Sequence, residues 1–167
     1  MSNYPDMIKF EEGFRSLAYY CSEGYPTIGH GFKLGPKYAP LKNYTFEMPE
    51  EVSCFWLKKY TEGLLDEFDK RPELRGALAA CMLADKIDDP DQWFLSPRAS
   101  VLLSMAHQMG IDGLAGFKQT LKYVAQAAWS NASANMLRSM WHDQTPNRAK
   151  RHAEQMRTGE WAKEYTA

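Results

Sequence analysis

The stretch FEEGFRSLAYYCSEGYPTIGHG, residues 10–31, places three potentially reactive side chains around a glycine-rich turn. A carboxylate stands at Glu12, a thiol at Cys21 and a hydroxyl at Thr27. Gly13 is expected to end a short N-terminal helix, and the aromatic and small apolar residues after it are interrupted by turn residues. This pattern predicts short antiparallel strands joined by tight turns. The function of the stretch depends on whether the three side chains meet in space.

The rest of the chain is predicted to be helical. Pro49 opens a segment whose apolar residues recur at helical spacing to about Lys70, which predicts one long helix. Apolar stripes continue beyond it, and we expect Ser130 or Asn131 to cap a helix that carries Trp141. The acidic segment at residues 85–91 lacks the glycine and the closing glutamate of a calcium loop, so we interpret it as a solvated connector.

A small β region, one long helix and a helical remainder predict an α+β protein that is mainly α. Two lobes with a cleft between them, where a polymer would bind, are the expected architecture. We expect one catalytic domain over residues 1–167, with a β lobe at about 13–48, a connecting helix at about 49–71, and a helical lobe formed by 72–167 together with 1–12.

Composition narrows the class of protein. The chain has 167 residues and is 44% hydrophobic, enough to bury a sizeable core. Neither a run of about 18 apolar residues nor a secretory signal is present, so membrane insertion is not expected. The three cysteines form no metal or disulfide pattern, no cofactor motif occurs, and Cys54 and Cys81 are expected to be small buried hydrophobes.

Charge is distributed unevenly along the chain. Residues 1–117 carry 12 basic and 17 acidic groups, whereas residues 118–167 carry 8 and 4. Such asymmetry fits a face that attracts an anionic polymer, although a charge imbalance more often reflects an ordinary solvated surface. No basic stripe interleaved with aromatic residues is present, and a nucleic-acid partner is therefore not expected.

Three blocks of sequence resemble the phage-type lysozymes, a family of glycoside hydrolases. The family signature is a glutamate, then an aspartate or cysteine, then a threonine, and this chain matches it at Glu12, Cys21 and Thr27. MAHQMGIDGLAGF (105–117) and WHDQTPNRAKRHAEQMRTGEW (141–161) resemble the carboxy-terminal lobe of the same family. The resemblance implies a two-lobed lysozyme-like fold and hydrolysis of the β-1,4 bond between N-acetylmuramic acid and N-acetylglucosamine in peptidoglycan.

The resemblance also implies roles for individual residues. Glu12 would be the general acid, and Thr27 would position the attacking water. Cys21 would activate that water or attack the anomeric carbon, in the place where other members have aspartate; a passive, packed cysteine is the alternative. Four further positions match substrate contacts in the family: Glu23, Gln108, Thr120 and Asn135. Arg148 matches the cation that would support the catalytic glutamate.

Two other classes of function remain open from the sequence. A Cys/His peptide hydrolase would use Cys21 and His30, but a third orienting group is missing, and His30 is better interpreted as structural. A peptidoglycan-binding protein of the same fold without activity is the stronger alternative, since Cys21 could mark lost catalysis. The two readings differ in whether new reducing ends form.

The biological setting follows from the resemblance and the missing signal. We expect a monomeric endolysin that accumulates in the host cytoplasm and lyses the cell for phage release. It would reach the periplasm and wall only with a holin-type partner that permeabilises the membrane. A virion-associated role is disfavoured because 167 residues leave no room for tail modules.

Overall fold

The computed structural model describes residues 3–166, which divide into two compact units. The β unit is Met7–Tyr60, and the helical unit joins residues 3–6 to residues 61–166. The division falls inside two helices, α1 (Tyr4–Glu12) and α2 (Glu50–Asp69). The lobe boundaries expected from the sequence stay predictions.

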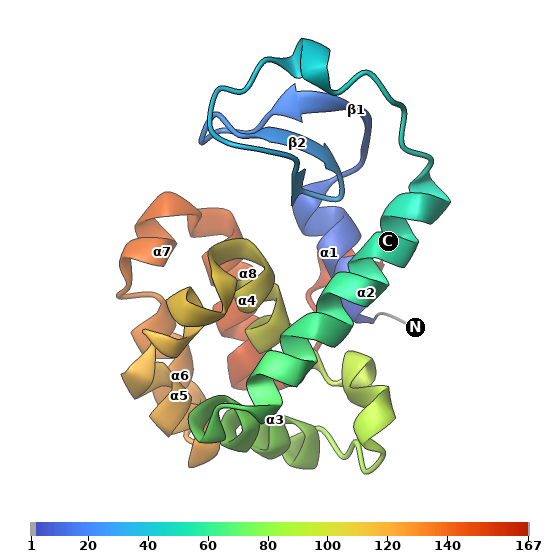
Figure 1. Cartoon of the computed structure of the whole chain (residues 1–167). Helices are drawn as coiled ribbons and strands as arrows, with labels where there is room; N and C mark the ends of the chain where they lie inside the picture. Colours follow the sequence, from blue (N-terminus) through green and yellow to red (C-terminus); the bar gives the residue numbers. More distant parts are fainter. Residues whose placement is uncertain (1–2, 167) are drawn as a thin grey trace. The chain divides into compact units, whose positions relative to one another are not determined.

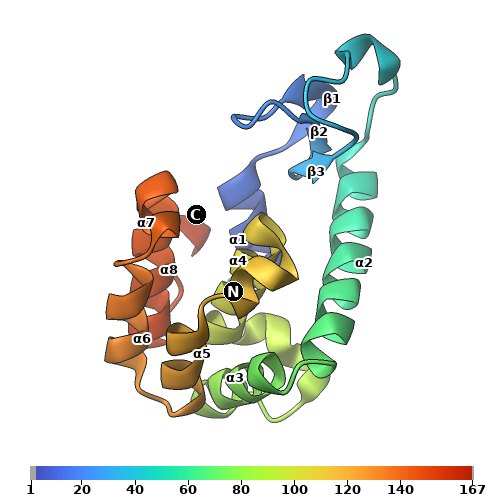
Figure 2. The same ribbon diagram turned by 60° about the vertical axis from the view of Figure 1, so that its left-hand side comes forward.

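A small sheet forms the centre of the β unit. Gly13, with φ of 65°, ends α1, and its N–H donates to the Lys9 carbonyl at 3.0 Å. Three antiparallel strands then pair in the order β1-β2-β3: β1 (Arg15–Tyr20), β2 (Pro26–Gly29) and β3 (Phe32–Lys33). Figure 1 labels β1 and β2, and Figure 2 labels all three strands. Tyr19 lies opposite Thr27 in this register. The short antiparallel strands predicted from the sequence are confirmed.

Aromatic packing ties the sheet to the first part of α2. Ile28 is fully buried, and the Phe32 ring stacks on Trp56 with centroids 4.7 Å apart and planes 4° from parallel. The connection from β3 to α2 contains the short helix η1 (Leu41–Asn43), and the Met48 N–H donates to the Ser16 carbonyl at 2.8 Å. The long helix predicted from Pro49 onward is confirmed.

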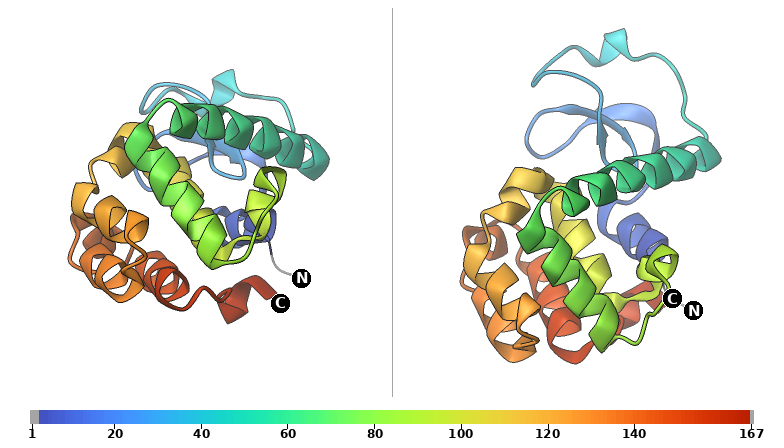
Figure 3. Two further views of the ribbon diagram at one scale, coloured as in Figure 1. Left: turned by 90° about the horizontal axis from the view of Figure 1, so that it is seen from below. Right: turned by 60° about the horizontal axis from the view of Figure 1, so that its bottom comes forward.

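The helical unit consists of packed helices, as the mainly α class predicts. Figure 2 shows α6 alongside α8 and next to α5, while Figure 3 shows α3, which packs on α4 and α5. Among residues 3–166, none of the helices has the length and apolar character that crossing a membrane requires. The elements after α2 are α3 (Pro72–Ala84), η2 (Pro90–Leu95), α4 (Pro97–Ala115), α5 (Lys118–Ala125), α6 (Trp129–Met136), α7 (Met140–Gln144), α8 (Pro146–Thr158) and η3 (Lys163–Thr166).

The single helix expected between residues 130 and 141 is wrong. The chain forms two helices there, because α6 starts at Trp129 without a side-chain cap and α7 starts anew behind Ser139. The Ser139 hydroxyl accepts from the His142 N–H at 3.3 Å and donates to the Met136 carbonyl at 2.6 Å, so one side chain serves the ends of both helices. The cap was therefore placed too early in the sequence.

The solvated connector expected at residues 85–91 is wrong for Asp85. Its side chain is 3% exposed and forms an ion pair with the guanidinium of Arg98, itself 9% exposed. The second carboxylate oxygen of Asp85 accepts from the Ser96 hydroxyl at 2.7 Å and from the Arg98 backbone N–H at 2.9 Å. A buried charge of this kind is tolerated because its hydrogen-bonding capacity is met on all sides.

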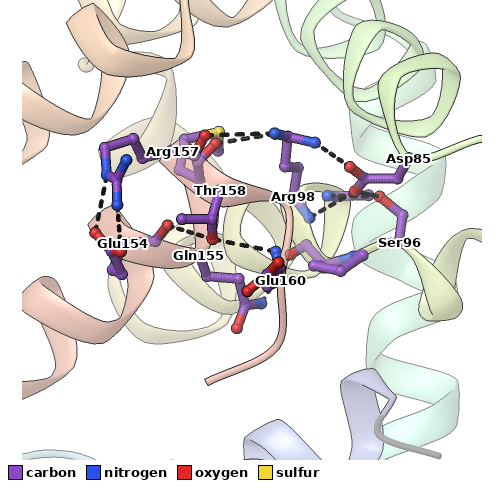
Figure 4. Close-up of polar contacts among 11 residues, drawn as sticks. Asp85, Ser96, Arg98, Glu154, Gln155, Arg157, Thr158 and Glu160 are labelled. Carbon is purple, nitrogen blue, oxygen red and sulfur yellow. Dashed lines mark hydrogen bonds and ion pairs between the residues drawn. The ribbon is translucent and has the colours of Figure 1, made fainter. Parts of the chain in front are cut away.

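Arg98 connects this carboxylate to the end of α8 (Figure 4). Its Nε donates to the Met156 carbonyl at 2.9 Å, and its guanidinium lies 4.5 Å from the centre of the Trp129 ring. Gly159 follows α8 with φ of 73°, and a Cβ added there would lie 2.2 Å from Nη1 of Arg98. Glycine is thus required at this helix end both for its backbone conformation and for the space that Arg98 occupies.

Candidate active site

Glu12 is the last residue of α1 and lies against the glycine turn that follows β2. A Cβ built on Gly31, which has φ of 84°, would lie 2.8 Å from Oε2 of Glu12. The carboxylate therefore occupies the space that any side chain at Gly31 would need. The glycine-rich turn predicted around the acid has a direct physical function, since it lets the backbone pass close to the carboxylate.

Cys21 and Thr27 occupy the turn and strand that follow β1. The Cys21 N–H donates to the Tyr25 carbonyl at 3.0 Å, and the Gly24 N–H donates to the Cys21 carbonyl at 2.8 Å, closing the turn. Thr27 is 2% exposed, and its hydroxyl donates to the Tyr25 carbonyl at 2.9 Å. That hydroxyl has one proton, which it can give either to this carbonyl or to an ionised Cys21 sulfur.

The pKa of the Cys21 thiol is lowered from its ordinary value. Partial burial raises this pKa, but the backbone N–H groups of Tyr25 and Glu23, the Thr27 hydroxyl and the positive charge of Lys33 together outweigh burial. Each of these groups favours the thiolate. The turn thus supports the form of cysteine that could act as a base or nucleophile.

Glu23 lies at the surface of the same turn. It forms an ion pair with Lys33 at 2.9 Å, and the two side chains are 64% and 52% exposed. The hydrogen bond from Lys33 to Glu23 raises the pKa of the lysine, and the Lys33 ammonium lies 4.2 Å from the centre of the Tyr25 ring. The predicted contact between Glu23 and substrate stays a prediction, and Lys33 is a cation near Cys21 that the sequence reading missed.

Tyr19 is a second residue that the sequence reading missed. Burial raises the pKa of its hydroxyl, as do the negative charges of Glu12 and Cys21, while Arg15 lowers it. Tyr19 therefore lies within electrostatic range of both the predicted acid and the predicted base. The sequence alone gave no signal for it, because the pairing of Tyr19 with Thr27 depends on the register of the two strands.

In the helical unit, the side chains predicted to contact substrate form hydrogen bonds with other residues of the protein. The Asn135 amide donates to the Thr120 hydroxyl at 2.8 Å, linking α6 to α5, and Thr120 is 1% exposed. The Gln108 side-chain oxygen accepts from the indole N–H of Trp141 at 2.8 Å. These bonds fix the side chains of Gln108, Thr120 and Asn135, whose role toward substrate stays a prediction.

Arg148 lies on α8 and is 7% exposed. Its guanidinium donates to the Ser104 hydroxyl on α4 at 2.9 Å, and the same hydroxyl lies 2.8 Å from Nε2 of His152. Burial, followed by the charges of Arg148 and Arg151, lowers the pKa of His152 well below its ordinary range. Arg148 is thus held in a defined position within the helical unit, and its support of Glu12 stays a prediction.

Comparison with known proteins places the chain beside lysozymes. No family model matches it. "Probable T4-type lysozyme 1" of Dictyostelium discoideum is 24% identical over 166 residues, and "Probable T4-type lysozyme 2" of the same organism is 29% identical over 168. Each alignment covers 95% of this chain and 96% of the relative. The pre-baseplate central spike protein Gp5 of Enterobacteria phage T4 is 28% identical over 155 residues, which are 87% of this chain and 26% of the spike protein.

Proposed function

Because the chain belongs to a T4-type lysozyme-like family, we propose that it is a muramidase that hydrolyses the β-1,4 bond between N-acetylmuramic acid and N-acetylglucosamine of bacterial peptidoglycan. The observation that carries this proposal is the β unit, in which a carboxylate, a thiol and a hydroxyl are arranged around one set of glycine turns. The alignments that cover 95% of the chain support it as well, since both relatives are named as lysozymes.

Glu12 is the proposed general acid. Cleavage of a glycosidic bond requires a proton on the leaving oxygen, and a carboxyl group at the edge of a turn can reach a sugar chain. Gly31 keeps the space next to this carboxyl clear of side chains, as a Cβ there would lie 2.8 Å from Oε2. After the proton has left, the carboxylate is available to receive one from water and return to its starting state.

Cys21 is the proposed base or nucleophile, with Thr27 as the group that positions water. A thiolate at Cys21 could take a proton from water, leading to inversion, or attack the anomeric carbon, leading to retention. The lowered pKa of Cys21 supports either use, because it raises the fraction of thiolate at neutral pH. The Thr27 hydroxyl, one hydrogen bond from Tyr25, is oriented within the same turn.

The decisive experiment measures new reducing ends and turbidity loss on purified peptidoglycan. Wild type is expected to release reducing ends, and Glu12→Gln is expected to lower the rate by about a hundredfold to ten-thousandfold, the usual contribution of a general acid. Glu11→Gln is the matched control, since it removes the neighbouring carboxylate of the same helix. Equal rates for Glu12→Gln and wild type would overturn the assignment of the acid.

The same assay decides the alternative. A lysozyme-like protein that only binds peptidoglycan would sediment with the wall material and release no reducing ends in any variant. That result would overturn the proposed muramidase while leaving the family and fold unchanged.

The proposed biological role is that of an endolysin, a monomer that acts on host peptidoglycan after a holin-type protein has opened the membrane. The relationship to a phage T4 protein supports a phage setting, whereas the two Dictyostelium relatives show that the family is not confined to phages. Expression in a bacterium with and without a membrane-permeabilising protein tests this. Lysis that requires both proteins and an intact Glu12 is expected, and lysis by this chain alone would overturn the need for a partner.

A further inference from the structure

A histidine, a glutamate and a cysteine converge in the β unit away from Cys21. His30 lies between β2 and β3, and Glu50 and Cys54 lie one helical turn apart at the start of α2. A ring nitrogen of His30, a carboxylate oxygen of Glu50 and the Sγ of Cys54 all lie within 4.8 Å of one another. Side chains from two separate segments thus bring three different donor atoms close together.

The state of His30 is not that of an ordinary structural histidine. The residue is 1% exposed, and Ser53 engages one side of it: the Ser53 Oγ lies 2.7 Å from Nδ1 and accepts from the His30 backbone N–H at 3.0 Å. Its other ring nitrogen, Nε2, is buried and has no hydrogen-bond partner among the described residues. A buried polar atom without a partner is uncommon and requires a physical explanation, which a bound metal ion would supply.

The donor set favours one class of ligand. Imidazole nitrogen, thiolate sulfur and carboxylate oxygen are the donors that Zn²⁺ and similar divalent transition metals accept, whereas Ca²⁺ and Mg²⁺ require oxygen ligands. Ser53 would then hold the imidazole from behind, as groups around metal-bound histidines commonly do. Lys9 lies 3.9 Å from Glu50 and Glu12 acts electrostatically on His30, so one positive and one negative group flank the cluster.

We propose that His30, Glu50 and Cys54 bind a divalent transition-metal ion of the zinc class, with water completing a four-coordinate site. Nε2 of His30 is the ring nitrogen left to bind, because Nδ1 is engaged by Ser53. The Cys54 thiol releases its proton to solvent when the metal–sulfur bond forms. The bound ion fastens the turn after β2 to the start of α2 within the β unit. No metal site was expected from the sequence, where Cys54 and His30 were interpreted as packing residues.

Cobalt(II) is a suitable probe, because thiolate ligation gives a charge-transfer band in the near ultraviolet and tetrahedral ligation intensifies its visible bands. Protein freed of metal with a chelator, which is then removed, is titrated with Co²⁺ alone. Wild type is expected to bind one equivalent with both signatures, and added Zn²⁺ is expected to remove them. Glu50→Gln is expected to weaken the affinity by about tenfold or more.

Two cysteine variants separate this site from other thiols. Cys54→Ser is expected to lose the charge-transfer band, whereas Cys21→Ser is expected to retain it. Cys54 is only partly buried, so its serine variant is expected to fold, which circular dichroism checks. No thiolate band in wild type, or an unchanged band in Cys54→Ser, would overturn the site. A rise in melting temperature with Zn²⁺ in wild type that Cys54→Ser lacks is the expected second readout.

Discussion

Two polar sites, one from each unit, have contrasting surroundings. In the helical unit, the buried carboxylate of Asp85 meets an arginine, a serine and a backbone N–H. In the β unit, Nε2 of His30 is buried without a partner among the described residues, and the partly exposed Cys21 thiol is surrounded by groups that favour its ionised form. A satisfied polar group stabilises the fold, whereas an unsatisfied one or a reactive one is available to a ligand.

The comparison predicts which variants change stability and which change activity. Asp85→Ala is expected to have the largest effect, a loss of about 3–5 kcal/mol in the free energy of unfolding, because Arg98 is left buried and unpaired. Chemical denaturation measures it, and activity per folded molecule should be retained. The exposed Asp88→Ala is the control, with a change of less than about 0.5 kcal/mol. Equal stability of the two variants would contradict the structural role of Asp85.

Cys21 variants test whether the thiol in the β unit affects activity and not stability. Cys21→Ala is expected to lower kcat by about a hundredfold with little change in melting temperature, since the thiolate would be lost but not a core contact. Wild-type activity should rise with pH as the thiol ionises, and Cys21→Asp should shift this rise to lower pH, because aspartate is ionised throughout the neutral range. If Cys21→Ala retains the full rate, the cysteine is a passive packing residue.

His152 makes stability depend on pH. Burial and the charges of Arg148 and Arg151 lower its pKa in the folded state. Below about pH 6.5, His152 is therefore protonated in the unfolded chain but stays neutral in the folded chain. Stability is therefore expected to fall by about 1.4 kcal/mol from this group between about pH 7.5 and 5.5. His152→Gln should reduce this loss. An unchanged slope in His152→Gln would contradict the assignment.

Asn135→Ala is expected to have a small effect on stability. Removing the amide leaves the buried Thr120 hydroxyl without its donor, at a cost of about 1 kcal/mol. If Asn135 also contacts substrate, as predicted from the sequence, the KM for peptidoglycan should rise as well. An unchanged KM would restrict Asn135 to holding α5 and α6 together.

The prediction from sequence succeeded where local chemistry determines structure. Gly13 ends α1, the short strands form where aromatic residues alternate with turns, and the helix beginning after Pro49 runs without a break. The prediction failed where a contact between separate segments determines the environment of a residue. Asp85 is the example, because its carboxylate is buried in an ion pair with Arg98 of α4. No spacing rule within residues 85–91 could show that pairing.

The candidate site shows the same limit. The sequence placed Glu12, Cys21 and Thr27 on one stretch, but the pairing of Tyr19 with Thr27 and the cation Lys33 beside Cys21 appear only when the strands are in register. The three donors around His30 were likewise invisible, because Glu50 and Cys54 belong to a helix some twenty residues further along the chain.

The sequence by itself determined the class of fold and the resemblance to lysozymes, and it predicted the reactive stretch, since these depend on residue types and their order. Only the tertiary structure decided which polar groups are satisfied and which are left open, because burial and hydrogen bonding depend on neighbours from elsewhere in the chain. The glycine turn around Glu12 illustrates both. Its glycines can be identified in the sequence, whereas the short distance between Gly31 and the carboxylate is seen only in the folded structure.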